Sequence, residues 1–410
     1  MTGRTNHCIR ISGTKKHLSA YGMFLFFLLL PFEYPLATIG VGSILRYVGI
    51  LTMGVAVLDV LGDGRKIRID YRIGMMLLWM VYAVISGFWC VSQSLYSYYI
   101  SIYINNSLMF VIISMVVFTQ EDAKIVEKGF VGGVILLLLY MTFVPGAITY
   151  SSWQNRLTLA YNGKELLDQN YLASIMVMQY GFFLYDVFDV KMKRMSRIIK
   201  AVIAITILYY ILRTGSRGGL LAAGAITIVC ICLNLKKHLA TVLVLVCVLV
   251  MISPYILHVL PESLLDRFSL KALTGATSES GARLVIWQIA WEAIKNSNVV
   301  FGYGAGASEM IIGLRYEYAA AIHNAFIAQV VELGLIGLVL FVGVVVSMLR
   351  ELLSSRWIKA CVGFVGIIVS SIFLDVLTTK FFWAAMMMLT VQISACRTIK
   401  KATKENPQEA

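Results

Sequence analysis

Long apolar runs separated by short polar segments make up almost the whole chain. A helix needs about 20 apolar residues to cross the hydrocarbon core of a membrane. The pattern predicts an all-α fold, a polytopic bundle of about 12 transmembrane helices. We treat it as a single integral membrane domain over residues 1–410. The predicted spans are 18–32, 36–61, 73–91, 98–118, 129–144, 171–187, 198–212, 218–235, 239–257, 324–349, 360–374 and 381–395.

The composition supports this class. Hydrophobic residues make up 59% of the chain and charged residues only 14%, a balance that soluble domains do not show. The seven cysteines fall in predicted spans or in the inner tails, and none lies well inside an outer loop. We therefore expect no disulfide framework, no metal site and no cofactor.

The basic residues follow the positive-inside rule. With a cytoplasmic N-terminus, 24 of the 35 Lys and Arg residues lie in inner tails and loops, ten lie outside, and Arg46 lies in a span. Both termini are then cytoplasmic. The inner excess accounts for the formal net charge of +13. This charge reflects insertion topology, so we expect no nucleic-acid partner.

Two long segments face outward in this topology, residues 145–170 and residues 258–323. Lysine would serve topology equally well, but the outer basic residues are biased towards arginine, whose planar guanidinium suits oxyanions. This bias favours anion recognition over chance surface placement. The outer arginines are Arg156, Arg213, Arg217, Arg267, Arg283 and Arg315.

The segment Arg213-Thr214-Gly215-Ser216-Arg217-Gly218-Gly219 interrupts two apolar runs. Guanidinium groups at a membrane edge are costly, and arginines beside a glycine-rich backbone suit a phosphate or diphosphate. A topology-setting charge cluster or a structural helix break would explain the segment equally simply. Its outward position weakens the topology explanation, because outer loops need no basic residues. The short span 198–212 suggests that Arg213 lies slightly below the membrane surface.

Part of the large outer loop, residues 258–323, has apolar residues at the spacing of a helix. Leu284, Trp287, Trp291 and Ile294 share one face of a helix, which predicts an amphipathic helix. Such a helix either lies on the membrane surface or over a cavity, or it packs against the bundle. The following run is Gly302-Tyr303-Gly304-Ala305-Gly306. Backbone N–H groups of such a run can bind a phosphate, but a lone glycine-rich run is weak evidence for such a site, so a tight turn is the default interpretation.

Polar residues mark the next span. His323 at its mouth has the chemistry of a general base near neutral pH, although a polar residue that starts a helix is the simpler interpretation. Glu332 lies inside the span, and Arg46 lies at a similar depth in the second span. Charges inside a membrane pair or line a polar cavity, so we expect Arg46 and Glu332 to pair or to face one cavity.

Together these motifs resemble the O-antigen ligase/polymerase family of bacterial membrane glycosyltransferases. The resemblance covers a core region of residues 145–341. It rests on the order and spacing of short motifs: Asp168-Gln169-Asn170-Tyr171-Leu172-Ala173, Thr214-Gly215-Ser216-Arg217-Gly218-Gly219, Arg283 with Trp287, Phe301-Gly302-Tyr303-Gly304-Ala305-Gly306, and His323-Asn324 with Glu332, Gly334 and Gly337.

The resemblance implies a metal-independent, inverting glycosyl transfer at the outer leaflet of the bacterial inner membrane. The donor would be a glycan on undecaprenyl diphosphate and the acceptor a glycan or a lipid, with envelope polysaccharide assembly proteins as further partners. Arg217 and Arg283 would hold the diphosphate, and Arg213 matches less firmly. His323 would assist the acceptor hydroxyl. Supporting roles would fall to Asp168, Asn170, Asn324, Glu332 and Arg46.

Three functions compete. A polymerase joins lipid-linked repeat units of a surface polysaccharide such as O-antigen, capsule or exopolysaccharide, and this is the reading we favour. A ligase moves the finished glycan to lipid A core or to another acceptor. A lipid-linked oligosaccharide flippase would also have many spans and buried charges. Transporters usually show two related halves, and this sequence shows no internal repeat.

Overall fold

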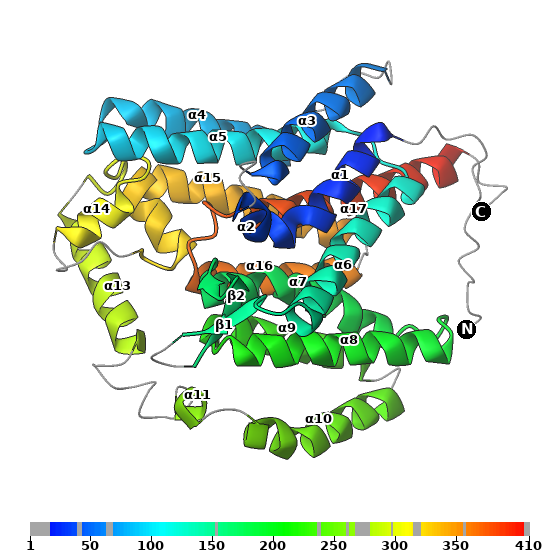
Figure 1. Cartoon of the computed structure of the whole chain (residues 1–410). Coiled ribbons are helices and arrows are strands. Elements are labelled where there is room, and N and C mark those ends of the chain that lie inside the picture. Colours follow the sequence, from blue (N-terminus) through cyan, green and yellow to red (C-terminus); the bar gives the residue numbers. More distant parts are fainter. Residues whose placement is uncertain are drawn as a thin grey trace.

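The computed structural model describes residues 17–38, 43–62, 69–151, 155–235, 239–259, 262–266, 279–296, 298–314, 321–355 and 358–405. These residues form a predominantly helical bundle in which successive long helices run in opposite directions (Figure 1). The predicted all-α class is confirmed.

The first part of the chain forms five long helices and three short ones. Polar caps fix two of their starts: Asp70 accepts hydrogen bonds from the N–H groups of Arg72 and Ile73, and Thr119 forms a capping box with Asp122. The elements are α1 Leu18–Leu29, η1 Leu30–Phe32, α2 Glu33–Leu36, α3 Ile44–Gly62, α4 Tyr71–Ile85, η3 Ser86–Phe88, α5 Gln93–Met115 and α6 Gln120–Phe143.

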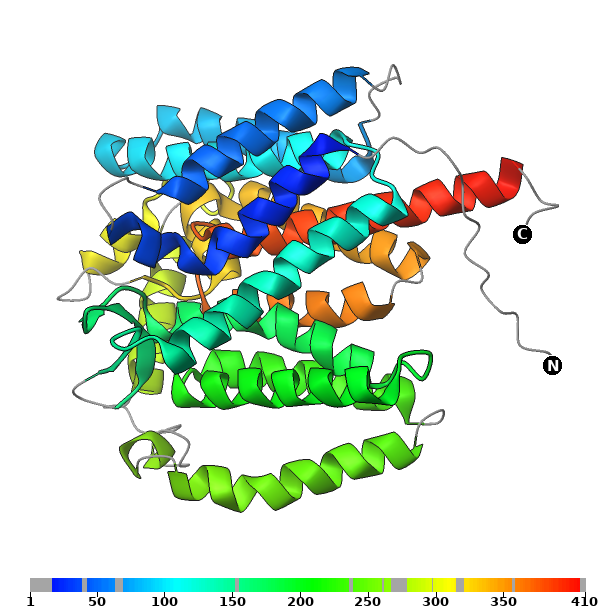
Figure 2. The ribbon, with the colours of Figure 1, turned by 45° about the vertical axis from the view of Figure 1, so that its right-hand side comes forward.

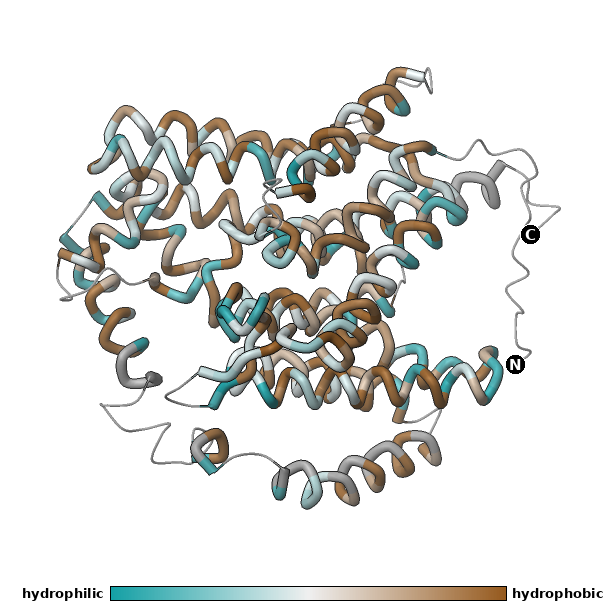
Figure 3. The backbone as a smooth tube through the Cα atoms, viewed as in Figure 1, coloured by the Kyte–Doolittle hydropathy of each residue, from teal (hydrophilic) through white to brown (hydrophobic). Residues whose placement is uncertain are grey.

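The second part adds the helices that carry most of the candidate site residues. They are α7 Gln169–Val187, α8 Arg194–Arg213, α9 Arg217–Asn234, α10 Leu239–Val259, α11 Glu262–Asp266, α13 Glu279–Lys295, α14 Ser308–Gly313, α15 Ala325–Ser355, α16 Ile358–Phe373 and α17 Lys380–Glu405. In the described part of the chain, eight helices are long and apolar enough to cross a membrane. Hydrophobic residues run along most of their length (Figure 3). The count of about 12 spans stays a prediction.

A small antiparallel sheet, which hydropathy alone did not predict, forms in the segment 145–170 that we expect to face outward. Its strands are β1 Ile148–Tyr150, β2 Leu157–Tyr161 and β3 Lys164–Glu165, in the order β1-β2-β3. Ile148 pairs with Leu159, and Ala160 pairs with Glu165. Leu157 and Leu159 are buried and pack into the core cluster around α7 and α9, so the sheet is anchored to the bundle.

The two ends of the bundle differ in their chemistry. The end at which α1 begins and α17 ends (Figure 2), which we call the ion-pair end, carries ion pairs between helices. The opposite end, which we call the turn end, holds the link between α8 and α9 and the small sheet. The pairs at the ion-pair end are His17–Asp122, Arg72–Asp70, Arg397–Asp70, Arg397–Glu351, Lys200–Asp186, Lys359–Asp186 and Lys359–Glu127.

Candidate functional site

Arg213 ends α8 and Arg217 begins α9, so only three residues separate the two helices. The link, which we call the arginine turn, is built by short polar side chains. Thr214 donates through its hydroxyl to the carbonyl of Ile211 at 2.6 Å, and Ser216 caps α9 by accepting from Gly219 N at 3.2 Å. The helix break that the sequence predicts is therefore a capped turn.

Glycines allow the arginine turn to pack tightly. Gly215 has a φ of +61°, and a Cβ there would lie 2.6 Å from Leu264 of α11. Both the backbone conformation and the lack of space therefore disfavour any side chain at this position. A Cβ on Gly219 would lie 2.7 Å from the Cβ of Ala173. The two motifs 168–173 and 214–219, far apart in sequence, are therefore in direct contact.

Arg213 is buried at this turn, with 9% of its surface exposed. Its guanidinium carbon lies 5.0 Å from the ring centroid of Tyr150 in β1, which is a cation–π arrangement. Its Nε is buried and has no hydrogen-bond partner among the described residues. A buried donor without a partner is expensive to maintain, so this nitrogen is well placed for an acceptor supplied by a ligand.

Two of the expected supporting residues lie behind the turn. Asp168 caps α7 by accepting from Asn170 N at 2.8 Å. The side-chain oxygen of Asn170 accepts a hydrogen bond from Arg156 at 3.0 Å. Arg156, just before β2, is one of the six arginines that we expect on the outer side. The supporting residues Asp168 and Asn170 thus join the hairpin to α7.

Helix α13, which carries Arg283, contacts the segment before His323 through Trp287. Arg283 and Trp287 are one turn apart on α13 and lie on the same side of it. The indole N–H of Trp287 donates to the carbonyl of Ile322 at 2.9 Å. Two of the three predicted catalytic residues, Arg283 and His323, are therefore linked through Trp287.

The helix predicted in the large loop exists, and Trp287 and Ile294 of its predicted apolar face pack in a buried cluster. Ile286, Ala290 and Ala293 are buried in a cluster with residues of α14 and α15, whereas Leu284 and Trp291 are 55% and 58% exposed. Ala290 and Ala293 permit α13 to approach α15 closely. Because alanine has little apolar surface, the hydrophobic pattern of the sequence indicates this buried face only weakly. Of the two interpretations, packing against the bundle is the one found for α13.

His323 has a left-handed backbone conformation, with a φ of 52°. This conformation is uncommon for residues other than glycine and draws attention to the position. The next residue, Asn324, accepts from the N–H groups of Phe326 and Ile327, each at 3.0 Å, and so starts α15. The helix-start role that we considered for His323 therefore belongs to Asn324.

The glycine-rich run 302–306 fits into a break in α15. Gly334 has non-helical angles, φ 64° and ψ −164°. The break frees backbone groups that the run satisfies: Tyr303 N donates to Val331 O at 2.9 Å, and Gly304 N donates to Glu332 O at 2.8 Å. In the other direction, Leu335 N donates to the carbonyl of Val299. These N–H groups bind α15, which argues against the phosphate-cradle interpretation.

Glu332 does not pair with Arg46, which corrects our expectation of a direct contact. Glu332 is completely buried, and its carboxylate accepts from Ser308 Oγ at 2.6 Å and from Tyr103 OH at 2.9 Å. Arg46 lies exposed on the first turn of α3. The buried carboxylate of Glu332 is hydrogen-bonded by the neutral hydroxyl groups of Ser308 and Tyr103, in place of the expected guanidinium of Arg46.

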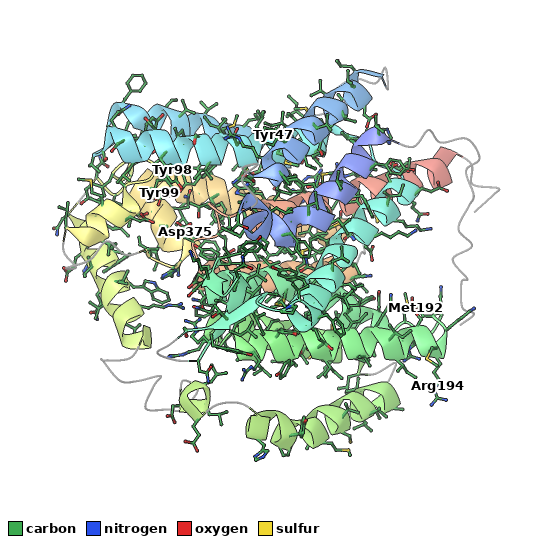
Figure 4. All side chains as sticks on the ribbon, in the orientation of Figure 1. Tyr47, Tyr98, Tyr99, Met192, Arg194 and Asp375 are labelled. Carbon is green, nitrogen blue, oxygen red and sulfur yellow. The ribbon has the colours of Figure 1, made fainter. Side chains whose placement is uncertain are left out.

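Sequence reasoning missed Asp375, in the loop between α16 and α17. Its Oδ1 is buried and has no hydrogen-bond partner in the part of the chain that the structure describes. Burial, followed by the negative charges of Glu332 and Glu309, raises the pKa of Asp375 to about 7. Figure 4 places Asp375 near Tyr99 at the turn end, far from Met192 and Arg194. An acidic residue in a short outer loop between two apolar runs was the available signal.

Comparison with known proteins gives one assignment. A family model described as O-antigen ligase matches residues 202–342. A search of curated proteins gives no match. The matched region holds the arginine turn, α13, the glycine-rich run and the break in α15. In this region, which contains Arg217, Arg283 and His323, the chain is similar to the O-antigen ligase family.

Proposed function

We propose that the protein is a metal-independent, inverting glycosyltransferase that acts at the outer leaflet of the bacterial inner membrane. It takes a glycan from undecaprenyl diphosphate and joins it to the hydroxyl of another lipid-linked repeat unit, so that it polymerises a surface polysaccharide. The turn end of the bundle faces outward in this proposal, and both chain termini are cytoplasmic.

The arginine turn carries the proposal. Arg213 is buried with an Nε that has no partner among the described residues, and Arg217 stands at the N-terminus of a helix of 18 residues. Guanidinium groups form bidentate bonds with phosphate oxygens, and the partial positive charge of a helix N-terminus adds to their field. The turn lies at the end of two membrane-length helices, where the headgroup of a lipid carrier would be found.

The reaction needs two kinds of help. The acceptor oxygen attacks the anomeric carbon, the bond from that carbon to the diphosphate oxygen breaks, and the diphosphate leaves with the bonding electrons. Arg217 and Arg283, with Arg213, stabilise the growing negative charge on the leaving group. His323 accepts the proton that the acceptor hydroxyl loses. Attack from the side opposite the leaving group inverts the anomeric carbon.

The test is gel analysis of surface glycan from a deletion strain that expresses single variants. Arg217→Ala and His323→Ala are expected to abolish the ladder of long chains. Arg350→Ala, an exposed arginine at the ion-pair end, and His258→Ala, an exposed histidine at the turn end, are the matched controls. Wild-type ladders from Arg217→Ala and His323→Ala would refute the assignment of the site.

The description of the matching family favours a second candidate, an O-antigen ligase that transfers the finished glycan to lipid A core or another acceptor. The two functions differ in what accumulates when the protein is lost. Deletion of a polymerase leaves single repeat units on the cell surface. Deletion of a ligase leaves long chains on the lipid carrier, so extraction of the carrier distinguishes the two.

A further inference from the structure

The hairpin β1–β2 touches the arginine turn from two sides. Tyr150, the last residue of β1, lies against the guanidinium of Arg213. Arg156, just before β2, donates from Nε to the carbonyl of Thr214 at 2.9 Å. One short hairpin therefore contacts both the last residue of α8 and the first residue of the segment that links α8 to α9.

Arg156 is buried, with 6% of its surface exposed. Its guanidinium group bridges two elements. Nε donates to Thr214 O in the turn, and a terminal nitrogen donates to Asn170 Oδ1 at the start of α7. Only a planar guanidinium offers two donors at this fixed spacing, so a lysine at this position would lose one of the two bonds.

The packing around Gly215 shows how close this support is. A Cβ on Gly215 would lie 3.2 Å from Cγ and 3.4 Å from Nε of Arg156. The Arg156 side chain thus lies directly on the backbone of the turn, two residues from Arg217. A shift of this backbone would move the first residue of α9 and the last residue of α8 together.

We propose that Arg156 is a positioning residue for the donor site, which holds Arg213 and Arg217 at the spacing that a diphosphate requires. This inference rests on the proposed function of the arginine turn. Arg156 acts through the Thr214 carbonyl and the Asn170 side chain, while Tyr150 fixes the plane of the Arg213 guanidinium. The hairpin outside residues 202–342 is then part of the donor site.

The test compares Arg156→Lys, which keeps the charge, with the wild-type protein in detergent micelles. The probes are the undecaprenyl-diphosphate-linked repeat unit as donor and inorganic pyrophosphate as competitor. We expect the KM for the donor and the inhibition constant of pyrophosphate to rise together, roughly tenfold, which is the effect of losing one charge-assisted hydrogen bond. The acceptor KM and kcat should change less than threefold.

Rescue separates positioning from a general loss of structure. Adding Asn170→Asp to Arg156→Lys restores an ionic contact across the same bridge and should recover most of the affinity for pyrophosphate. Lys164→Met, which removes an exposed charge from β3, is the control that should match wild type. A folded Arg156→Lys with unchanged donor KM and pyrophosphate inhibition would overturn the inference.

Arg217→Ala distinguishes this failure from failure of the proposed function. If Arg217→Ala is inactive while Arg156→Lys behaves as wild type, the donor site stands and the positioning role of Arg156 is rejected. If Arg217→Ala retains full turnover, the donor site itself is misplaced, and the inference fails with it.

Discussion

The indole N–H of Trp287 donates a 2.9 Å hydrogen bond to the carbonyl of Ile322, the residue before His323. This bond joins the helix that carries Arg283 to the segment that carries the proposed base. It also precedes the left-handed backbone of His323. The backbone geometry at His323 therefore depends on Trp287, which lies one helical turn from Arg283 on α13.

Trp287→Phe should keep the ring and remove the donor. We expect kcat to fall about tenfold, because the Ile322 carbonyl loses a bond worth about 1 kcal/mol and His323 is held less firmly. Turnover of the lipid-linked donor measures the effect. Trp291→Phe, a change in an exposed ring on the same helix, is the control. Equal activity of the two variants would contradict this role.

Gly334→Ala should unfold the contact between α15 and the glycine-rich run. A Cβ at this position would lie 2.2 Å from the carbonyl oxygen of Val300, and the φ of +64° disfavours any side chain. We expect a loss of about 3 kcal/mol or more, since both strain and a steric clash contribute.

Thermal unfolding in detergent measures this loss. Gly224→Ala, at a helical glycine with open space around its Cα, is the matched control and should be neutral or slightly stabilising. A Gly334→Ala protein with wild-type thermal stability would show that the break in α15 is dispensable.

Tyr103→Phe should destabilise the protein because it removes a donor from the buried carboxylate of Glu332. Leaving a buried acceptor without a hydrogen-bond donor costs about 1–3 kcal/mol, and more when the acceptor is charged. Tyr98→Phe, on an exposed neighbour, should have no measurable effect on the melting temperature. By the same contacts, exchanging the charges of Arg46 and Glu332 should not restore activity, and a restored double variant would contradict the structure.

Asp375 should make stability depend on pH. Its carboxyl loses its proton near pH 4 in the unfolded chain but only near pH 7 in the folded protein, because of burial and of Glu332 and Glu309. The hydroxyls of Tyr99, Tyr103 and Tyr171 also face it. The folded state binds more protons in between, so the free energy of unfolding falls as pH rises from about 4 to about 7.

Asp375→Asn removes the buried carboxyl group, and with it the loss of stability that its ionisation causes as pH rises. Its melting temperature should exceed that of wild type by about 2–4 °C or more at pH 8, and the difference should shrink towards pH 5. Glu262→Gln, at an exposed acid of α11, should leave the profile unchanged. A constant difference between Asp375→Asn and wild type at every pH would argue against a raised pKa in the folded protein.

The sequence predicted the helices well where apolar runs are long. The span expected at 198–212 is α8, Arg194–Arg213, because the polar residues at its start continue the helix beyond the apolar run. It did not predict the sheet, since strands of three and five residues leave too little periodicity to detect. Local patterns fix a helix more firmly than they fix a short strand.

The site was predictable as a set of residues but not as a set of contacts. Arg213 and Arg217 stood out because charges are costly beside apolar runs. The bridge from Arg156 to Thr214 spans 58 positions of sequence, and the bond from Tyr103 to Glu332 spans 229. Such partners follow from tertiary packing, so no local pattern could supply them, and the pairing of Arg46 with Glu332 failed for this reason.

The break in α15 at Gly334 has a consequence for chimeric proteins. Residues 299–304 and 331–336 exchange backbone hydrogen bonds, so they form one folding unit although they belong to an outer loop and to a span. Grafting the predicted outer loop of a relative onto this chain would separate the two halves of that unit. A functional transplant has to carry both segments and to place its junctions before residue 299 and after residue 336.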